Sequence, residues 1–290
     1  MSKKLFIFGC GYSCSRLGQS LLDLGWEVFG TIRCKKKATE IQSLGITPVF
    51  FYDEERINKI LADEISILVS IPPVGDKDIV LEKFSSSINL FAKKINWLGY
   101  LSTTGVYGNY HGEWVDEESS LNSRSDLGKN RILAEKNWIE ISKSADCPLY
   151  IFRLAGIYGP ERSYIERLQK GVARKIITQD HYFNRIHVDD ISGIVIKALN
   201  FPNLADIYNV SDDLPCPGYK VVEEAARLLN ISTVEEIDFK DAQLSEMAKS
   251  FYLESKRISN RKLKEKLNYG LLFPNYKKGL LSILKKQNKN

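Results

Sequence analysis

The sequence predicts an α/β protein built on a doubly wound parallel sheet, with a small α/β cap in its C-terminal part. Two observations lead to this fold class. Short apolar runs alternate with amphipathic segments through residue 155, and the first run ends in a glycine-rich turn. Apolar runs of this kind are typical of strands buried on both faces, and the helices between them imply right-handed crossovers within one sheet.

Six strands are expected in the first part of the chain. They cover Lys4–Phe8, Glu27–Ile32, Thr47–Phe51, Ile65–Val69, Trp97–Leu101 and Leu149–Arg153. The spacing of apolar residues predicts helices over Leu17–Leu24, Lys83–Lys94 and Arg131–Ser142. Pro72 and Pro73 end the fourth strand, because proline has no N–H to give to a neighbouring strand.

The alternation loosens after residue 155. Asp206–Val210 is expected to form a further strand, and Val221–Leu229 and Leu271–Leu284 are expected to form helices. We therefore interpret residues 1–155 as the sheet domain and residues 156–290 as mostly cap, with a segment of about 184–210 returning to the sheet. Such a cap covers the carboxyl edge of the sheet, where open α/β sheets bind ligands.

The composition is that of an ordinary globular protein. The chain has 290 residues, of which 43% are hydrophobic and 27% charged, and this excludes a disordered or fibrous chain. Part of the net charge of +5 comes from lysines near the C-terminus, namely Lys277, Lys278, Lys285, Lys286 and Lys289. A run of this kind is typical of a solvated helix face, so we do not expect nucleic-acid binding.

The cysteines and the apolar segments indicate the cellular setting. Five cysteines are scattered without a C-x-x-C pair, which predicts neither a disulfide framework nor a metal site. No apolar stretch reaches the roughly 18 residues of a membrane span, and the N-terminus shows no signal peptide. We expect a cytoplasmic protein that does not enter a membrane.

The turn Gly9–Cys14 has the sequence G-C-G-Y-S-C and lies between the first strand and the first helix. In this context the first glycine allows a tight turn, and the second lets a pyrophosphate approach the N–H groups of the helix N-terminus. Cys14 replaces the third glycine of the usual G-x-G-x-x-G pattern and is small enough to pack there. The turn predicts a dinucleotide-binding Rossmann domain; a tight turn without a ligand is the alternative.

The end of the second strand bears on the choice of dinucleotide. An acid that binds the ribose hydroxyls of NAD is missing there, since Thr31 and Arg33 are followed by Lys35–Lys37 and the first acid is Glu40. A guanidinium suits a 2′-phosphate. We therefore predict NADP, with NAD as the alternative; the basic residues could instead be only a solvated helix start.

Five segments in order resemble a known group of enzymes. They are Gly9–Gly11, Ser102–Gly108, Arg153–Pro160, Arg185–Asp190 and Tyr208–Val210. Together they resemble the extended short-chain dehydrogenase/reductases, the NAD(P)-dependent epimerase/dehydratase superfamily, over nearly the whole chain. The resemblance implies a Ser/Thr after the fifth strand, which is Thr103 here, and a Tyr-x-x-x-Lys on the next helix. That tyrosine exchanges the substrate proton, and the Ser/Thr polarises the substrate oxygen.

The chain departs from this pattern at the tyrosine and the lysine. Aligned on Ala134-Glu135, their positions hold Leu127 and Arg131, and no tyrosine lies between Tyr110 and Tyr150. The literal Tyr252-x-x-x-Lys256 lies in the cap and is interpreted as a coincidence of composition. The chain thus resembles an atypical subgroup that lacks the usual catalytic pair.

Hydride chemistry therefore requires another proton source. Tyr107, His111, Lys129 and a bound water are the candidates, and Tyr107 is preferred because it follows the active-site strand; packing beneath the nicotinamide is its alternative role. Arg131 remains able to bind a ribose.

The resemblance and the glycine turn together imply a set of cofactor contacts. They are Gly9, Gly11, Tyr12, Ser13, Cys14, Thr31, Arg33, Ser70, Ile71, Pro72, Arg131, Leu154 and Ala155. His187 is expected to be structural rather than catalytic, and Asp189 or Asp190 is expected to cap the helix that follows it. No metal ligand set is predicted.

Two functional hypotheses follow. The first is an NADP(H)-dependent oxidoreductase or epimerase/dehydratase-like enzyme that acts on an unknown small molecule, such as a nucleotide sugar or a carbonyl compound. The alternative is a catalytically inactive NADP(H)-binding sensor or scaffold protein. Helices over Lys83–Lys94 and Arg131–Ser142 are expected to form a homodimer contact, with a monomer as the alternative.

Overall fold

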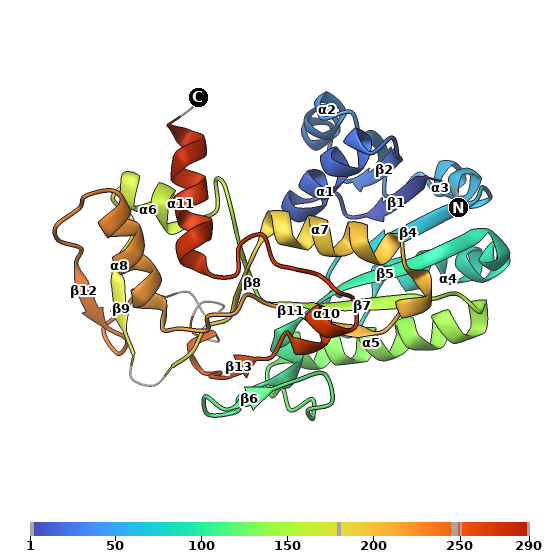
Figure 1. The fold of residues 1–290 in the computed structure, drawn as a ribbon. Coiled ribbons are helices and arrows are strands. Elements are labelled where there is room, and N and C mark those ends of the chain that lie inside the picture. The colour runs from blue at the N-terminus through green and yellow to red at the C-terminus, as the bar shows by residue number, and fades with distance from the viewer. Residues whose placement is uncertain (1–2, 179–180, 245–248, 250, 289–290) are drawn as a thin grey trace.

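The computed structural model describes residues 3–178, 181–244, 249 and 251–288, and a seven-stranded parallel sheet lies at its centre (Figure 1). The strands are β1 (Lys4–Phe8), β2 (Glu27–Ile32), β3 (Thr47–Phe50), β4 (Ile65–Val69), β5 (Ile95–Thr103), β7 (Leu149–Leu154) and β11 (Ile207–Val210). Their order is β11-β7-β5-β4-β1-β2-β3. The chain winds from β1 toward both edges of the sheet, so the predicted doubly wound α/β fold is confirmed.

Helices cover both faces of this sheet. One face is covered by α1 (Tyr12–Asp23), α2 (Lys35–Ser43), α7 (Val188–Leu199) and α10 (Arg261–Glu265), and the other by α3 (Glu54–Leu61), α4 (Ile79–Leu90) and α5 (Asp126–Ala145). Each layer buries its own hydrophobic cluster against the strands. Because both faces are covered, β4 is buried at every position, as its mostly apolar sequence predicts.

The predicted strands agree with the structure to within two residues at each end, whereas the helices differ more. The first helix begins at Tyr12, directly after the glycine turn, and not at Leu17. The prediction of a helix over Leu271–Leu284 is wrong at its start, since α11 covers Tyr276–Gln287. The backbone N–H groups of Leu272 and Phe273 instead donate to the carboxylate of Asp190, at 2.7 and 3.0 Å, and this holds the segment before α11 in a non-helical path.

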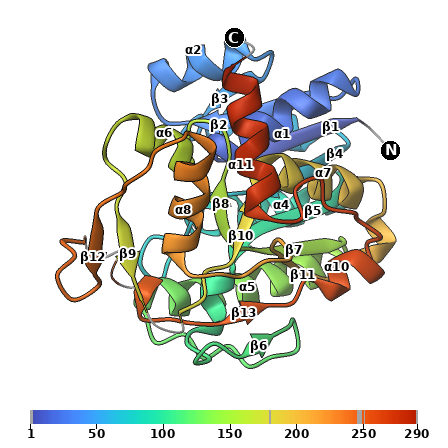
Figure 2. The ribbon, with the colours of Figure 1, turned by 60° about the vertical axis from the view of Figure 1, so that its left-hand side comes forward.

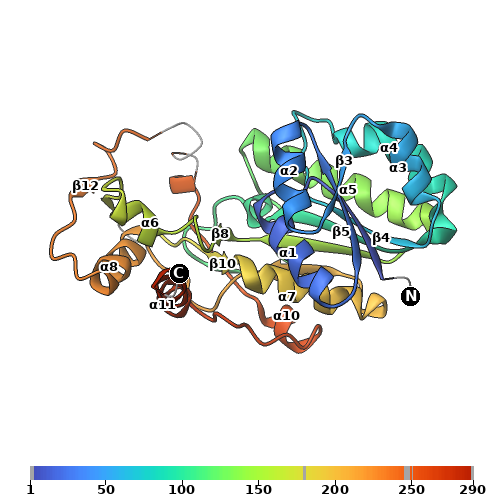
Figure 3. The same cartoon turned by 90° about the horizontal axis from the view of Figure 1, so that it is seen from above.

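The C-terminal part forms a smaller unit beside the carboxyl edge of the sheet, as Figures 2 and 3 show. It contains β8 (Gly156–Tyr158), α6 (Tyr164–Gln169), β9 (Lys175–Ile177), β10 (Arg185–His187), α8 (Gly218–Leu228), β12 (Glu236–Asp238) and α11. Strands β8 and β10 pair in parallel, as do β9 and β12. Helices α6, α8 and α11 enclose a separate hydrophobic cluster.

Short elements complete the edge of the sheet. They are the 3₁₀ turns η1 (Ala92–Lys94), η2 (Thr104–Tyr107) and η3 (Pro202–Leu204), and the paired strands β6 (Trp114–Val115) and β13 (Arg257–Ile258). β13 comes late in the sequence and lies beside β6, so the last part of the chain returns to the loop that follows β5. In the part of the chain that the structure describes, every helix is too short or too polar to cross a membrane.

The cap of α7 corrects one prediction. His187, and not Asp189 or Asp190, is the N-cap, because its Nδ1 accepts a hydrogen bond from the backbone N–H of Asp189 at 3.1 Å. The carboxylate of Asp189 is instead bound by Arg16 of α1 at 2.9 Å, and that of Asp190 holds the segment before α11. Burial lowers the pKa of His187 to about 4, which keeps the imidazole neutral and able to accept this bond.

Candidate functional site

The glycine turn after β1 requires glycine at its first position. Gly9 has a φ of +92°, and a Cβ there would lie 2.7 Å from Cγ1 of Ile71. Its N–H donates to Oγ1 of Thr31 at 2.7 Å, and its carbonyl accepts from the hydroxyl of Ser70 at 2.6 Å. The ends of β1, β2 and β4 are therefore tied together at the start of the turn.

The N-terminus of α1 is open toward solvent. Gly11 is the N-cap, the first turn carries no acid, and within the described residues no side chain caps the helix. A Cβ on Gly11 would meet nothing within 4 Å, so the space beside it is free. The N–H groups of this turn and the positive end of the helix dipole thus face an unobstructed volume, which suits an anion.

The small residue for helix–strand packing lies one turn further along α1 than the motif predicts. Cys14 is buried, but a Cβ on Gly18 would lie 2.5 Å from Cδ1 of Ile46, so Gly18 allows the close approach of α1 to the sheet. The sequence analysis missed this residue. Its signal was a glycine seven residues after Gly11, on the buried face of the helix.

A cleft of about 660 Å³ begins at this helix N-terminus and runs between the sheet and the smaller C-terminal unit. Of the predicted site residues, those that line it are Gly11, Tyr12, Ser13, Cys14, Ser70, Pro72, Thr103, Arg131, Leu154 and Ala155. The C-terminal unit contributes residues that the sequence analysis did not assign to the site, among them Arg162, Tyr182, Asn184, Glu254 and Lys256. Because the volume is in the range of small-molecule sites, we treat this cleft as the candidate functional site.

Four predicted residues lie next to the cleft and not in its wall. Gly9, Thr31 and Ile71 form the back of the glycine turn. Arg33 is exposed immediately after β2, at the same edge of the sheet as the turn. The N–H of Cys10 donates to the carbonyl of Thr31 at 3.0 Å, which fixes the end of β2 beside the turn.

The geometry argues against Tyr107 as the proton source. Its side chain is fully buried and does not line the cleft. Its hydroxyl donates to Oδ1 of Asn209 at 2.7 Å and accepts from Nη1 of Arg153 at 2.9 Å, and burial raises its pKa to about 12. His111 and Lys129, the other side chains considered, are exposed and also lie outside the cleft wall.

The residues around Tyr107 form a buried polar network. Glu135 of α5 accepts from Ser102 at 2.5 Å and pairs with Arg153 at 2.8 Å, and Arg153 reaches Tyr107. Three of the five segments that carry the family resemblance, Ser102–Gly108, Arg153–Pro160 and Tyr208–Val210, therefore meet in one network that joins β5, α5, β7 and β11. The hydrogen bonds of this network account for the presence of Tyr107 in its segment, without a catalytic role for its hydroxyl.

Thr103 and Arg131 remain at the cleft. Oγ1 of Thr103 accepts a hydrogen bond from the N–H of Gly105 at 3.1 Å, and Nη1 of Arg131 donates to the carbonyl of Leu101 at 2.6 Å. The guanidinium also lies 5.6 Å from the ring centre of Tyr100. Leu127, in contrast, is 61% exposed and is absent from the cleft wall, so this position of α5 offers the cleft no hydroxyl.

Arg162 brings a second guanidinium to the glycine-turn end of the cleft. It lies 5.7 Å from the ring centre of Tyr12, and the hydroxyl of Tyr12 donates to the carbonyl of Pro160 at 2.8 Å. Burial raises the pKa of Tyr12 to about 12, so its hydroxyl stays protonated and keeps this bond. The loop that carries Arg162 is thereby fixed to the start of α1.

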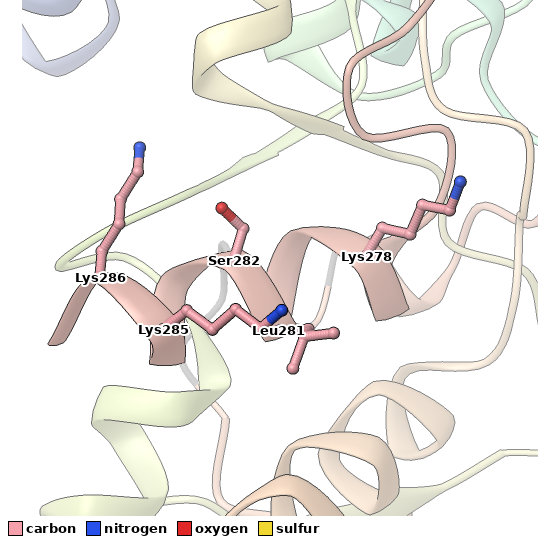
Figure 4. A pocket seen from close by; sticks show the side chains of 5 residues that line it. All are labelled: Lys278, Leu281, Ser282, Lys285 and Lys286. Atoms are coloured by element: carbon pink, nitrogen blue, oxygen red, sulfur yellow. The ribbon is translucent and has the colours of Figure 1, made fainter. Parts of the chain in front are cut away.

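A second hollow, of about 390 Å³, lies on α11 and is drawn in Figure 4. It is lined by Lys278, Leu281, Ser282, Lys285 and Lys286. Lys278 and Lys286 extend from opposite ends of the helix, and Lys286 pairs with Asp189 at 3.3 Å. All of its lining residues come from one helix, as expected for a solvated basic face, and we assign no ligand to it.

Comparison with known proteins gives the chain a family but not an activity. No family model matches the chain. A functionally unknown conserved protein from Silicibacter pomeroyi DSS has a structure with a TM-score of 0.91 and 37% identity, and the match covers 98% of both chains. The chain belongs to the family of this Silicibacter protein.

Two further matches are more distant. Protein YeeZ of Escherichia coli strain K12 is 26% identical over 223 residues, which are 72% of this chain and 77% of YeeZ. The UDP-glucuronic acid 4-epimerase of Bacillus cereus, solved with UDP-glucuronic acid and NAD, has a TM-score of 0.74 at 18% identity, and the match covers 98% of this chain and 99% of the epimerase. This structural likeness places the family in the same fold as the epimerase.

Proposed function

We propose that the protein is an NADP(H)-dependent oxidoreductase or epimerase/dehydratase-like enzyme that acts on a small molecule of the carbonyl or nucleotide-sugar class. The observation that carries this proposal is the uncapped, acid-free N-terminus of α1, which opens into a cleft at the carboxyl edge of a parallel sheet. Backbone N–H groups at such a position are a suitable site for a pyrophosphate. The NAD in the Bacillus cereus epimerase structure supports the same class of cofactor.

The cleft residues fit a dinucleotide along its length. Gly11 leaves free space where a pyrophosphate has to approach the backbone, and Arg162 adds a positive charge there. Leu154 ends β7 and Ala155 follows it, and the two provide an apolar wall for a nicotinamide, while Arg131 is placed to hold its ribose. When bound, a nicotinamide supplies or accepts a hydride. In this arrangement the role of Thr103 is to polarise the substrate oxygen.

The choice of NADP over NAD rests on the end of β2. Arg33 is exposed beside the glycine turn, and Glu40, the first acid after β2, pairs with Lys37 at 2.5 Å. A free guanidinium and a neutralised acid favour a 2′-phosphate over bare ribose hydroxyls.

The alternative function is an NADP(H)-binding sensor or scaffold without turnover. The position of Leu127 favours it, because an exposed leucine stands where the resemblance implies the catalytic tyrosine. Oxidation of NADPH with a panel of carbonyl compounds and nucleotide sugars separates the two, with Thr103→Ala as the test variant and Thr103→Ser as its control. Turnover that falls in the alanine variant and survives in the serine variant supports the enzyme. Partner binding that changes with NADPH, without turnover, supports the sensor.

The experiment that tests the cofactor proposal is a fluorescence titration of the purified protein with NADPH and, in parallel, with NADH. We expect micromolar binding of NADPH and weaker binding of NADH, since only the first carries the phosphate that Arg33 can bind. Absence of binding by both nucleotides contradicts the cofactor and the enzyme proposals together.

We also propose a homodimer formed by α4 and α5. The two helices pack side by side on one face of the sheet, and Trp138 of α5 donates to Asp78 at the start of α4 at 2.8 Å. Leu90 of α4 and Leu133 of α5 are exposed, at 76% and 40%, which leaves apolar surface for a second copy. Light scattering at micromolar concentration tests this, and the mass of a single chain contradicts it.

A further inference from the structure

Lys256 is a buried lysine in the wall of the cleft. It is 6% exposed and comes from the segment before β13, far along the chain from the glycine turn. Lysine is almost never buried to this degree unless its amine is paired with a carboxylate or hydrogen-bonded. Tyr252, which completes the literal Tyr-x-x-x-Lys, does not line the cleft and packs on Phe183 and Phe239.

The amine of Lys256 is fixed to the turn that begins at Thr103. Its Nζ donates to the carbonyl of Gly108 at 2.7 Å, at the end of η2, and to Oε2 of Glu254 at 2.9 Å. Within the described part of the chain these bonds use two of the three N–H groups of an ammonium, so one remains for a ligand. Glu254 also lines the cleft, so the ion pair stands at its wall.

The backbone around Lys256 is also held by Asn184, which directly precedes β10. Nδ2 of Asn184 donates to the carbonyl of Lys256 at 2.9 Å, and Oδ1 of Asn184 accepts from the N–H of Ile258 at 2.8 Å. The carbonyl of Asn184 in turn accepts from the N–H of Gly156 at 3.0 Å, directly after the predicted nicotinamide wall of Leu154 and Ala155. Lys256 is therefore placed rigidly with respect to both the Thr103 turn and the end of β7.

The surroundings favour loss of the lysine proton. Burial lowers the pKa of Lys256, and this outweighs the opposite effect of Glu254. His181 is the other titratable group that faces it among the described residues, and its pKa is lowered by burial and by the charge of Lys256. The neutral imidazole adds no positive charge to the ion pair that Lys256 forms with Glu254.

We propose that Lys256 is a catalytic residue that exchanges a proton with the oxygen of a carbonyl or hydroxyl substrate, in place of the tyrosine that α5 lacks. The proposal rests on the function proposed above, in which a nicotinamide supplies or accepts the hydride. In the reducing direction the carbonyl carbon gains that hydride and the C=O π bond breaks. The oxygen then takes a proton from the Lys256 ammonium, which becomes a neutral amine and regains a proton from water.

Two other polar residues of the cleft, Arg131 and Thr103, are less suited to this step. An arginine side chain does not give up a proton in proteins, and the hydroxyl of a threonine is too weak an acid for this step. A lysine whose pKa is lowered by burial gives up its proton more readily than an exposed lysine, which suits a proton-transfer group.

The first test measures the proton affinity of Lys256 in the full chain. Lysine is isotope-labelled at Cε, its NMR resonances are followed against pH, and the signal of Lys256 is identified by its loss in Lys256→Arg. Lys262, which pairs with Asp206 outside the cleft at 2.8 Å, is the internal control. We expect Lys256 to titrate at lower pH than Lys262 and to shift when NADPH is added. Titration at or above the pH of Lys262 overturns the proposal.

The second test measures whether a carbonyl compound reaches the amine. Pyridoxal phosphate forms an imine with an accessible neutral amine, and borohydride reduces it to a stable adduct that mass spectrometry locates. Because a lowered pKa leaves more of an amine in its neutral form, we expect Lys256 to be labelled faster than Lys262. NADPH should protect it. Equal labelling of the wild type and Lys256→Met overturns the proposal.

Turnover is the third measurement. Lys256→Met and Lys256→Arg should keep NADPH affinity and lose about a hundredfold or more in NADPH oxidation with the carbonyl panel, whereas Lys262→Met keeps both. Turnover retained in Lys256→Arg contradicts the inference, since arginine keeps the charge but cannot transfer the proton. Labelling of Lys256 in a protein that does not bind NADPH contradicts the proposed cofactor alone. Binding of NADPH without labelling contradicts the role of Lys256 alone.

Discussion

Glu135 and Arg153 form an ion pair inside the protein, with Oε2 and Nη2 2.8 Å apart and each side chain 3% exposed. The pair joins α5 to β7, and both partners have further bonds, to Ser102 and to Tyr107. These bonds compensate the desolvation of two charges, which a bare buried pair does not achieve. The pair is thus the centre of the network that holds the motif segments together beside the cleft.

Breaking this pair should destabilise the fold strongly. In Glu135→Gln or Arg153→Met one charge stays buried without its counterion, and we expect a loss of about 3–5 kcal/mol in the free energy of unfolding. Urea unfolding measures it. Arg174→Met is the matched control, because Arg174 pairs with Glu235 at 2.9 Å on the surface, with about 60% of each side chain exposed. That loss should stay below about 1 kcal/mol; equal losses in the two sets would contradict the assigned role of the buried pair.

The two glycines of the turn should separate stability from binding. Gly11→Ala places a methyl group in open space at a φ of −92°, so the expected cost is that of a poorer N-cap residue, about 1 kcal/mol or less. The same methyl group stands where a pyrophosphate approaches, and we expect NADPH to bind about tenfold or more weakly. Fluorescence titration and thermal unfolding of one preparation measure both effects.

Gly9→Ala is the complementary variant. Its Cβ lies 2.7 Å from Ile71 at a φ of +92°, so we expect a loss of about 1–3 kcal/mol in stability whether or not NADPH is present. If Gly11→Ala bound NADPH as the wild type does, the pyrophosphate would have to lie elsewhere.

The sequence was sufficient for the sheet because its signals are local. The run from Ile65 to Val69 is apolar on both faces of the strand, as burial on both faces requires. The glycine turn in the same way marks the start of α1. Helix ends were less predictable because tertiary contacts set them. Nothing in the sequence near Leu272 shows that its N–H donates to Asp190, which is distant in the chain, so that α11 begins only at Tyr276.

The site divides in the same way. Gly11 was predicted at the cleft from the turn that follows the first strand, and Thr103 and Leu154 were predicted there with the help of the family resemblance; all three line it. Tyr107 follows the predicted active-site strand in the sequence, yet its hydroxyl is buried and hydrogen-bonded to Asn209 and Arg153. Lys256 could not be found from spacing, because the pairing of β13 with β6 brings it back to the cleft and no sequence period marks that pairing.

Arg33→Ala should weaken NADPH binding and leave NADH binding unchanged. A charge-assisted hydrogen bond to a 2′-phosphate contributes about 1.5–3 kcal/mol, and the exposure of Arg33 places the expected effect at the lower end, about tenfold in Kd. Parallel titrations with the two nucleotides measure it. Lys36→Ala removes a charge from the exposed start of α2 and serves as the control. An equal loss for NADH and NADPH, or no loss in either, would contradict the assignment of NADP.

Asp212 should make the protein less stable as pH rises. Its side chain is 1% exposed, its Oδ1 accepts from the N–H of Leu214 at 3.2 Å, and its Oδ2 has no partner among the described residues. Burial raises the pKa of this carboxyl to about 7, from 3.8 for the free group. The folded state therefore holds a proton that the unfolded state has released between about pH 4 and pH 7, and stability falls across that interval.

Asp212→Asn should remove this dependence, because an amide keeps the acceptor for Leu214 without the charge. The stability of the variant minus that of the wild type should be small near pH 4 and rise to a plateau above pH 7, at about 4 kcal/mol. The buried His187, whose lowered pKa acts in the opposite sense on stability, is present in both proteins and cancels in the difference. Asp213→Asn, next to it in sequence but paired with Lys264 at 2.5 Å, controls for loss of a nearby negative charge. A difference that stays flat with pH would show that Asp212 is charged in the folded protein, so that a counterion or water outside the described contacts must stabilise it.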